Sequence, residues 1–151
     1  MRIAVTYKGD RAVADERNDW RDSGLSQRHR QWGYDCPCLD VDGLVVEYDR
    51  AEPKALIEYK HLASAGAQGA NRKALARLGD RAGVPFLVVR YRREPWQFWV
   101  TPANSVAMRA SSSTHAMSER QFVSFLYRLG GRDLPADLAE TLSSAEPQVA
   151  A

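Results

Sequence analysis

The 151-residue sequence has few cysteines and no long apolar segment, and both absences restrict the classes of protein to which it can belong. The two cysteines, Cys36 and Cys38, are too few for a disulfide framework and, at one residue apart, closer than the paired ligands of most structural zinc sites. Free thiols are therefore favoured over a zinc site. Apolar runs such as Pro85–Val89 are too short to span a bilayer. With no secretory signal visible, we expect a cytoplasmic protein without a membrane partner.

The sequence also lacks a glycine-rich phosphate loop, a nucleophilic serine or cysteine elbow and zinc-finger spacing, which removes three common routes to function. It has no large net charge either, since 21 basic and 19 acidic side chains leave only +2. The charges are nevertheless unevenly distributed. Residues 35–60 carry −4 (3 basic, 7 acidic), whereas residues 61–132 carry +8 (11 basic, 3 acidic). A nearly neutral total therefore conceals an acidic segment beside a basic segment that is suited to phosphate groups.

Hydrophobic periodicity predicts an α/β protein with a small central mixed sheet flanked by helices. We expect strands at residues 39–48, 54–60, 86–91 and 96–100, and helices at residues 24–32, 70–82 and 118–129. The first two strands are joined by a polar turn and should form a hairpin. We predict one domain over residues 1–134, with a loop at 103–116. Residues 135–151 are expected to be a disordered tail, with a short helix just beyond Leu134 as an alternative.

Ionisable side chains interrupt two of these apolar strands at positions that share a face. Asp40 and Asp42 alternate along the first strand, and Glu58 and Lys60 alternate along the second. Burying such charges is costly unless they pair with one another or hold a metal ion. Carboxylate oxygens suit Mg²⁺ or Mn²⁺, and a neighbouring lysine can orient or help deprotonate an attacking water. The set therefore fits phosphodiester hydrolysis, and a solvated cross-strand salt bridge is the simpler alternative.

The same residues carry a resemblance to a known family. An acidic residue at a strand start (Asp42-Gly-Leu-Val-Val), a turn and an apolar strand ending in Leu-Ile-Glu58-Tyr-Lys60 resemble the signature of the PD-(D/E)xK nuclease superfamily. The helix and buried strand that follow, through Phe86-Leu-Val-Val, extend the likeness over about residues 20–101. The resemblance implies a restriction-endonuclease-like αβββαβ core.

The resemblance also implies a role for each matching residue. Asp42 and Glu58 would bind Mg²⁺ or Mn²⁺, with the carbonyl of Tyr59 as a further ligand. Lys60 would orient the attacking water and complete the catalytic set. Asp40 competes with Asp42 as the first acidic residue, because no proline immediately precedes either. We prefer Asp42, which directly precedes the apolar part of its strand, and keep Asp40 as a second acidic metal ligand.

Polar and basic residues on two predicted helices are candidates for contacts with DNA. Many members of the family place a glutamate on the first helix, where this sequence has glutamine, arginine and histidine instead. This departure implies one metal ion rather than two, or contacts to DNA phosphates. A solvated face is the alternative for the basic side of the second helix. The candidates are Gln27, Arg28, Gln68, Asn71, Arg72 and Lys73.

Other residues near these segments receive weaker assignments. His61 follows Lys60 and is more often incidental at such a position than a proton-transfer group. Arg90, Arg92 and Arg93 lie at a strand end and would extend the basic surface. We assign the neighbouring aromatic residues to core and hairpin packing rather than to stacking with bases. These aromatic residues are Tyr91, Trp96, Phe98 and Trp99.

We therefore expect a Mg²⁺- or Mn²⁺-dependent deoxyribonuclease that acts on DNA, with structure-selective or weakly sequence-selective cutting and a homodimer as one state. Recombination, repair and bacteriophage DNA processing all use enzymes of this kind. The alternative is a catalytically inactive protein with a nuclease-like fold that binds nucleic acid or another partner. The unusual first helix favours this alternative.

Overall fold

The computed structural model describes residues 31, 41–47, 49–63 and 70–145. The chain divides into two compact units, residues 1–39 and 40–151, and every element discussed below belongs to the second. Of the helix predicted over residues 24–32, only Gln31 falls within the described residues, and it is helical. No helix in the described ranges is long and apolar enough to cross a membrane.

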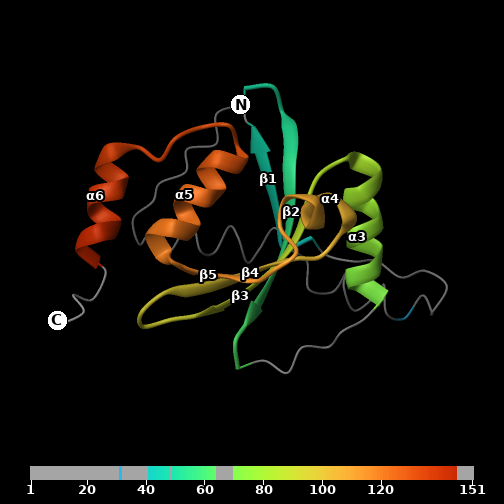
Figure 1. The fold of residues 1–151 in the computed structure, drawn as a ribbon, viewed down its shortest axis with the longest axis horizontal. Coiled ribbons are helices and arrows are strands. Elements are labelled where there is room, and N and C mark those ends of the chain that lie inside the picture. The colour runs from blue at the N-terminus through green and yellow to red at the C-terminus, as the bar shows by residue number, and fades with distance from the viewer. Residues whose placement is uncertain (1–30, 32–40, 48, 64–69, 146–151) are drawn as a thin grey trace. The chain divides into compact units, whose positions relative to one another are not determined.

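Five strands form one mixed sheet in the order β1-β2-β3-β4-β5 (Figure 1). They are β1 (Gly43–Glu47), β2 (Glu52–His61), β3 (Phe86–Arg92), β4 (Gln97–Pro102) and β5 (His115–Ser118). Neighbouring strands are antiparallel except β2 and β3, which are parallel because a helical crossover connects them. The predicted α/β class and the predicted β1–β2 hairpin are confirmed, and β3 and β4 form a second antiparallel pair.

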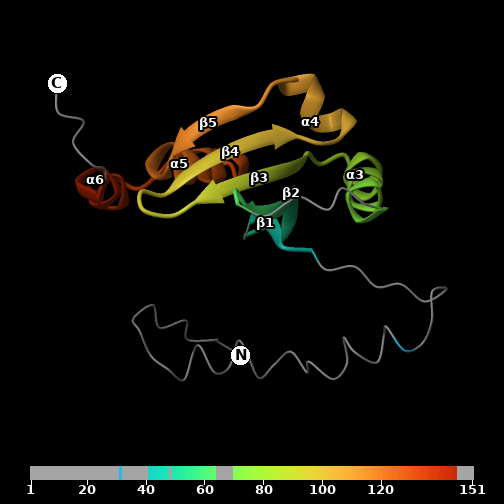
Figure 2. The ribbon, with the colours of Figure 1, turned by 90° about the horizontal axis from the view of Figure 1, so that it is seen from below.

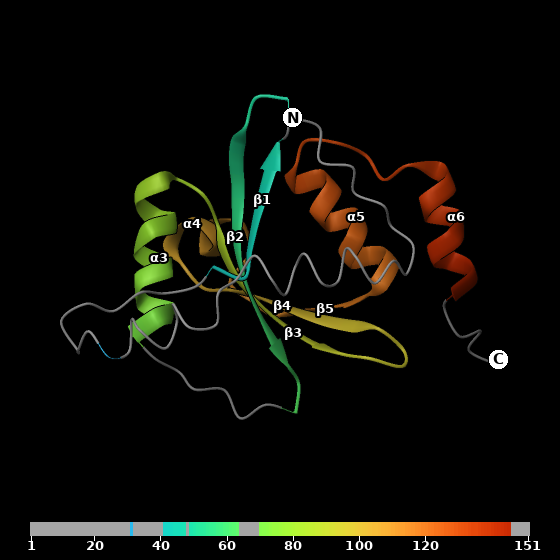
Figure 3. The same cartoon turned by 180° about the vertical axis from the view of Figure 1, so that it is seen from behind.

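Helices pack on both faces of this sheet. α3 (Ala70–Ala82) crosses from β2 to β3, and α5 (Glu119–Leu129) lies on the opposite side of β1 and β2 (Figures 2 and 3). Alternate residues of the strands face the two helices. The cluster on the side of α3, here called the α3 face, contains Leu56, Leu75, Val84, Phe86 and Val88. The cluster on the α5 face contains Ile57, Leu87, Val89, Phe98, Val100, Ala107 and Phe122.

Helix α3 has the bounds that the sequence predicts. It ends at Gly83, whose φ of +70° is the left-handed conformation that commonly terminates helices. Inside the helix, Gly79 is buried where the backbone approaches the segment after the helix. A Cβ atom on Gly79 would lie 2.7 Å from Asn104 Nδ2 and 2.9 Å from the Val84 carbonyl oxygen. The absence of a side chain at Gly79 therefore sets how closely α3 packs.

We expect Gly79→Ala to lower the free energy of unfolding by about 1–3 kcal/mol, the usual cost of forcing volume into a packed site. The sign of this change is informative. In a helix with free space at this position, replacing glycine by alanine would raise the free energy of unfolding by about 1 kcal/mol. Urea unfolding followed by circular dichroism measures the change. Arg77→Ala, at an exposed position of the same helix, is the control and should alter stability little. An equally stable or more stable Gly79→Ala protein would contradict the close approach.

The prediction of a loop over residues 103–116 is wrong, because two regular elements occupy much of it. α4 (Ser105–Ala110) begins after Asn104, whose Oδ1 accepts a hydrogen bond from the backbone N–H of Ala107. Strand β5 then starts at His115 and forms the edge of the sheet beside β4. Farther along, α6 (Ala136–Ala145) is a helix within the segment predicted as a tail.

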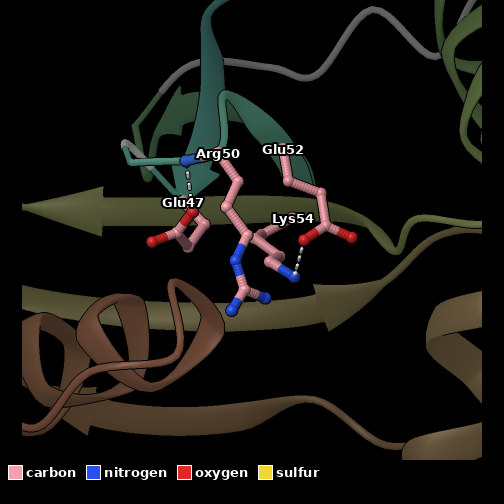
Figure 4. A network of polar contacts seen from close by, with 4 residues as sticks. All are labelled: Glu47, Arg50, Glu52 and Lys54. Carbon is pink, nitrogen blue, oxygen red and sulfur yellow. Dashed lines mark hydrogen bonds and ion pairs between the residues drawn. The ribbon is translucent and has the colours of Figure 1, made fainter.

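The turn between β1 and β2 is held by two local contacts (Figure 4). Glu47 Oε2 accepts a hydrogen bond from the Arg50 backbone N–H at 2.8 Å, and Glu52 Oε2 accepts one from Lys54 Nζ at 2.8 Å. Glu47 and Glu52 are direct cross-strand partners, so these contacts offset the repulsion between their carboxylates. The hydrogen bond from Lys54, and then its charge, lower the pKa of the exposed Glu52 carboxyl. These contacts hold the turn end of the hairpin, and the register shifts by one residue between Val45 and Val46.

Candidate active site

Glu58 and Lys60 both project from the α3 face of β2, as strand alternation predicts. Lys60 Nζ lies 2.8 Å from Glu58 Oε1, so the two side chains form an ion pair. The side chain of Glu58 is 12% exposed and that of Lys60 is 35% exposed. The pair lies at the border of the buried cluster that includes Leu56 rather than on a fully solvated surface.

Asp42 immediately precedes β1 and contacts β2 through its carboxylate. Gly43 pairs with Ile57 in the antiparallel register. One residue before Gly43 on the first strand therefore lies opposite one residue after Ile57 on the second, which places Asp42 opposite Glu58. Asp42 Oδ2 accepts a hydrogen bond from the Tyr59 backbone N–H at 2.9 Å, although the two residues are 17 positions apart in the sequence. The hairpin thus brings the predicted acidic residue next to the Glu-x-Lys motif.

The carbonyl of Tyr59 points to the same side as Asp42. The backbone N–H groups of Leu56 and Leu62 donate to the Pro85 and Tyr91 carbonyls, on the side of β3. Backbone groups alternate in direction along a strand, so the N–H and C=O of Tyr59 point toward β1. The β1–β2 pairing begins at Gly43, and this carbonyl therefore lies just beyond the last paired residues. It occupies the edge of the site where a further metal ligand is expected.

One oxygen of Glu58 is buried without compensation. Oε1 contacts Lys60, whereas Oε2 is buried and has no hydrogen-bond partner among the residues that the structure describes. A buried polar atom without a partner costs about 1–3 kcal/mol, and more when it is charged. Native proteins retain such atoms where a ligand or ion satisfies them, or where they serve chemistry. Glu58 is therefore the most informative side chain of the candidate site.

The ring of Tyr59 belongs to the other side of the sheet. It makes edge contacts with Tyr91 and Phe122, at centroid distances of 6.4 and 6.3 Å. Burial, and then the Asp42 charge, raise the pKa of the Tyr59 hydroxyl. His61 likewise faces Tyr91, at 5.4 Å, and its Nδ1 accepts a hydrogen bond from the Ala63 N–H. His61 therefore lies on the face opposite the Glu58–Lys60 pair.

Of the predicted DNA contacts, three fall within the described residues. Asn71 and Lys73 are exposed and Arg72 is partly exposed, all in the first turn of α3. Because α3 runs back from the end of β2 to the start of β3, its first turn lies toward the Lys60 end of β2 (Figure 1). Asp40, Gln27, Arg28 and Gln68 lie outside the described residues.

The donor set fits a magnesium-like cation. In the described part of the chain, no group of three or more histidine, cysteine, aspartate or glutamate side chains could hold a metal ion. Mg²⁺, however, keeps several waters and is commonly bound through one or two carboxylates. Asp42 and Glu58 supply two carboxylates from neighbouring strands, and the uncompensated Glu58 Oε2 is an oxygen that a cation would satisfy. Cys36 and Cys38 lie outside the described ranges.

The structure also separates aromatic residues that the sequence assigned together to packing. Phe98 is in the core of the α5 face, whereas its neighbour Trp99 projects from the α3 face, paired in register with Arg90. The alternation along β4 was the signal for this difference.

Comparison of the chain with protein-family models, curated proteins and solved structures found no match. The functional argument therefore rests on the geometry of the site.

Proposed function

We propose that the chain is a Mg²⁺- or Mn²⁺-dependent nuclease that hydrolyses DNA phosphodiester bonds in the cytoplasm. The observation that carries the proposal is Glu58 Oε2, which is buried and lacks a partner among the described residues, while Oε1 contacts Lys60. A purely structural ion pair gains nothing from burying its second oxygen unpaired. A carboxylate that holds both a lysine and a cation uses one oxygen for each.

In this proposal, Asp42 and Glu58 hold the cation, with the Tyr59 carbonyl as a further ligand. A divalent cation, when bound, lowers the pKa of a coordinated water and offsets the charge of the phosphate. Lys60 orients the attacking water and donates a hydrogen bond to the developing negative charge. The Tyr59 N–H keeps the Asp42 carboxylate in place. Asn71 and Lys73 contact DNA phosphates beside the reaction centre.

The proposal includes a restriction-endonuclease-like arrangement of the sheet. It is supported by an antiparallel β1–β2 hairpin that carries the acidic and Glu-x-Lys motifs, followed by the α3 crossover and the parallel strand β3. A second candidate is a catalytically inactive protein that binds nucleic acid through the same surface. The lack of a three-residue metal-binding group among the described residues favours this candidate.

Metal dependence separates the two candidates. The full chain, freed of metal with EDTA, is incubated with labelled duplex, single-stranded, flap and four-way-junction DNA, with and without added Mn²⁺ or Mg²⁺. We expect products only when the metal is added, and no products when EDTA is restored, because the carboxylates need a cation to activate water. DNA binding without products under every metal condition would favour the inactive candidate. Equal cleavage in EDTA would contradict the assigned site.

A further inference from the structure

A row of four residues crosses the α3 face beyond the part that α3 covers. The register aligns Lys60 of β2 with Arg90 of β3, Arg90 with Trp99 of β4, and Trp99 with Ala116 of β5. Residues paired in this way lie on the same face, about 5 Å apart from strand to strand. The next row contributes Arg92, paired with Gln97. The sheet thus presents a cationic strip that begins at the candidate active site.

The side chains of this strip are accessible. Arg90, Arg92 and Ala116 are exposed, and Trp99 is partly exposed. The contacts of α3 lie at the other end of this face, in the cluster of Leu56, Phe86 and Val88. The guanidinium of Arg92 lies 5.9 Å from the centre of the Trp99 ring, an arrangement that orients both side chains. Trp99 is therefore partly accessible and is held in position by Arg92.

The charges around Trp99 favour an anionic ligand. Lys60, Arg90 and Arg92 are all cationic, and the carboxylate one row away, Glu58, is in contact with Lys60. Aromatic rings between cationic side chains are the arrangement by which proteins bind single-stranded nucleic acid, since bases stack on the ring and phosphates contact the cations. A duplex keeps its bases stacked on one another, so it offers no free base surface to a ring on a sheet.

We propose that this face binds single-stranded DNA, with a base stacked on Trp99 and the backbone phosphates held by Arg90 and Arg92. The strand then reaches Lys60 and Glu58 at the near end of the same row. The inference rests on the proposed function in one respect: it names single-stranded DNA as the form of the nuclease substrate. Binding itself requires neither the metal nor cleavage, so the two proposals can fail separately.

The test is the anisotropy of a fluorescent oligothymidine titrated with the full chain in EDTA. We expect Trp99→Leu to weaken binding by about 5- to 150-fold, the range of one lost base stack. Arg90→Gln should reduce the slope of log affinity against log salt by about 0.7, the value for one phosphate on a single strand. Because Arg90 is exposed, Arg90→Gln should fold normally. It therefore tests the inference even if Trp99→Leu folds poorly.

Trp96→Leu is the matched control. Trp96 is 41% exposed and also has an arginine over its ring, Arg93 at 5.4 Å, but it stacks on Tyr91 and Phe98 of the α5 face. We expect its loss to leave binding unchanged. The inference is overturned if Trp99→Leu and Arg90→Gln bind like the wild type, if Trp96→Leu weakens binding as much as Trp99→Leu, or if a duplex binds more tightly than oligothymidine.

The metal-dependent cleavage assay keeps the two proposals distinguishable. Metal-dependent products together with unaltered binding by Trp99→Leu would remove the single-strand inference and leave the nuclease. Weakened binding by Trp99→Leu, with no products from the wild-type protein at any metal concentration, would retain the binding face and remove the nuclease.

Discussion

Replacing Glu58 by glutamine is expected to reduce metal-dependent DNA cleavage by at least about 100-fold, the scale on which losing a group that stabilises transition-state charge acts. The amide nearly preserves the size of the side chain but removes the negative charge that holds a cation. Because the wild-type Oε2 is buried and has no partner among the described residues, the neutral side chain should not destabilise the fold. The rate of cleavage under single-turnover conditions measures the effect, with thermal unfolding measured alongside.

The same strand supplies a matched control for this substitution. Glu52 and Lys54 are also two residues apart on β2 and also form a contact of 2.8 Å, but Glu52 is 52% exposed and lies at the turn end of the hairpin (Figure 4). We expect Glu52→Gln to cleave at the wild-type rate. If Glu58→Gln cleaves within a few-fold of Glu52→Gln, Glu58 does not hold the metal. Equal losses in both variants would show that the loss does not report a role specific to Glu58.

Lys60→Ala extends the argument to the second motif residue. It removes the cation that contacts Glu58 Oε1, so we expect a loss of cleavage in the range of about 10²- to 10⁴-fold. Some loss of stability should accompany it, because a largely buried carboxylate then lacks its partner. Lys54→Ala is the corresponding control. Cleavage by Lys60→Ala at the rate of Lys54→Ala would show that Lys60 is structural.

The placement of these residues was accessible from the sequence because strand alternation and hairpin pairing are local rules. The position of Asp42 opposite Glu58 also depends on a register shift between Val45 and Val46, whereas Glu58 and Lys60 had to share a face once β2 was assigned. The same holds for α3, whose ends are marked by residue types. The capping box of Ser118 and Gln121 at the start of α5 was predicted for the same reason and is confirmed.

What the sequence did not reveal depends on contacts between distant segments. The six residues of α4 are too few to form a stable helix alone and too few to show a helical periodicity in the sequence. Strand β5 has only four residues and is defined by its pairing with β4. Alternation along β4 placed Phe98 and Trp99 on opposite faces, but which of the two faces α5 covers depends on the whole sheet. Composition alone could not separate them.

Asn104 is the residue through which these distant segments meet. It is 4% exposed, and its side chain bonds three backbone groups. Oδ1 accepts hydrogen bonds from the N–H groups of Phe86 and Ala107, each at 2.9 Å, and Nδ2 donates to the Val84 carbonyl at 2.9 Å. One asparagine therefore starts α4, anchors the first residue of β3 and joins both to the segment after α3.

We expect Asn104→Ala to lower the free energy of unfolding by about 3–5 kcal/mol, since each buried group left without a partner costs about 1–3 kcal/mol. This is a large part of the roughly 5–15 kcal/mol that stabilises a typical domain. Urea unfolding followed by tryptophan fluorescence measures the change. Asn71→Ala, at an exposed position in the first turn of α3, is the matched control and should shift stability by less than about 0.5 kcal/mol. A loss below 1 kcal/mol for Asn104→Ala would mean that water replaces its bonds, and that packing alone joins α4 to the sheet.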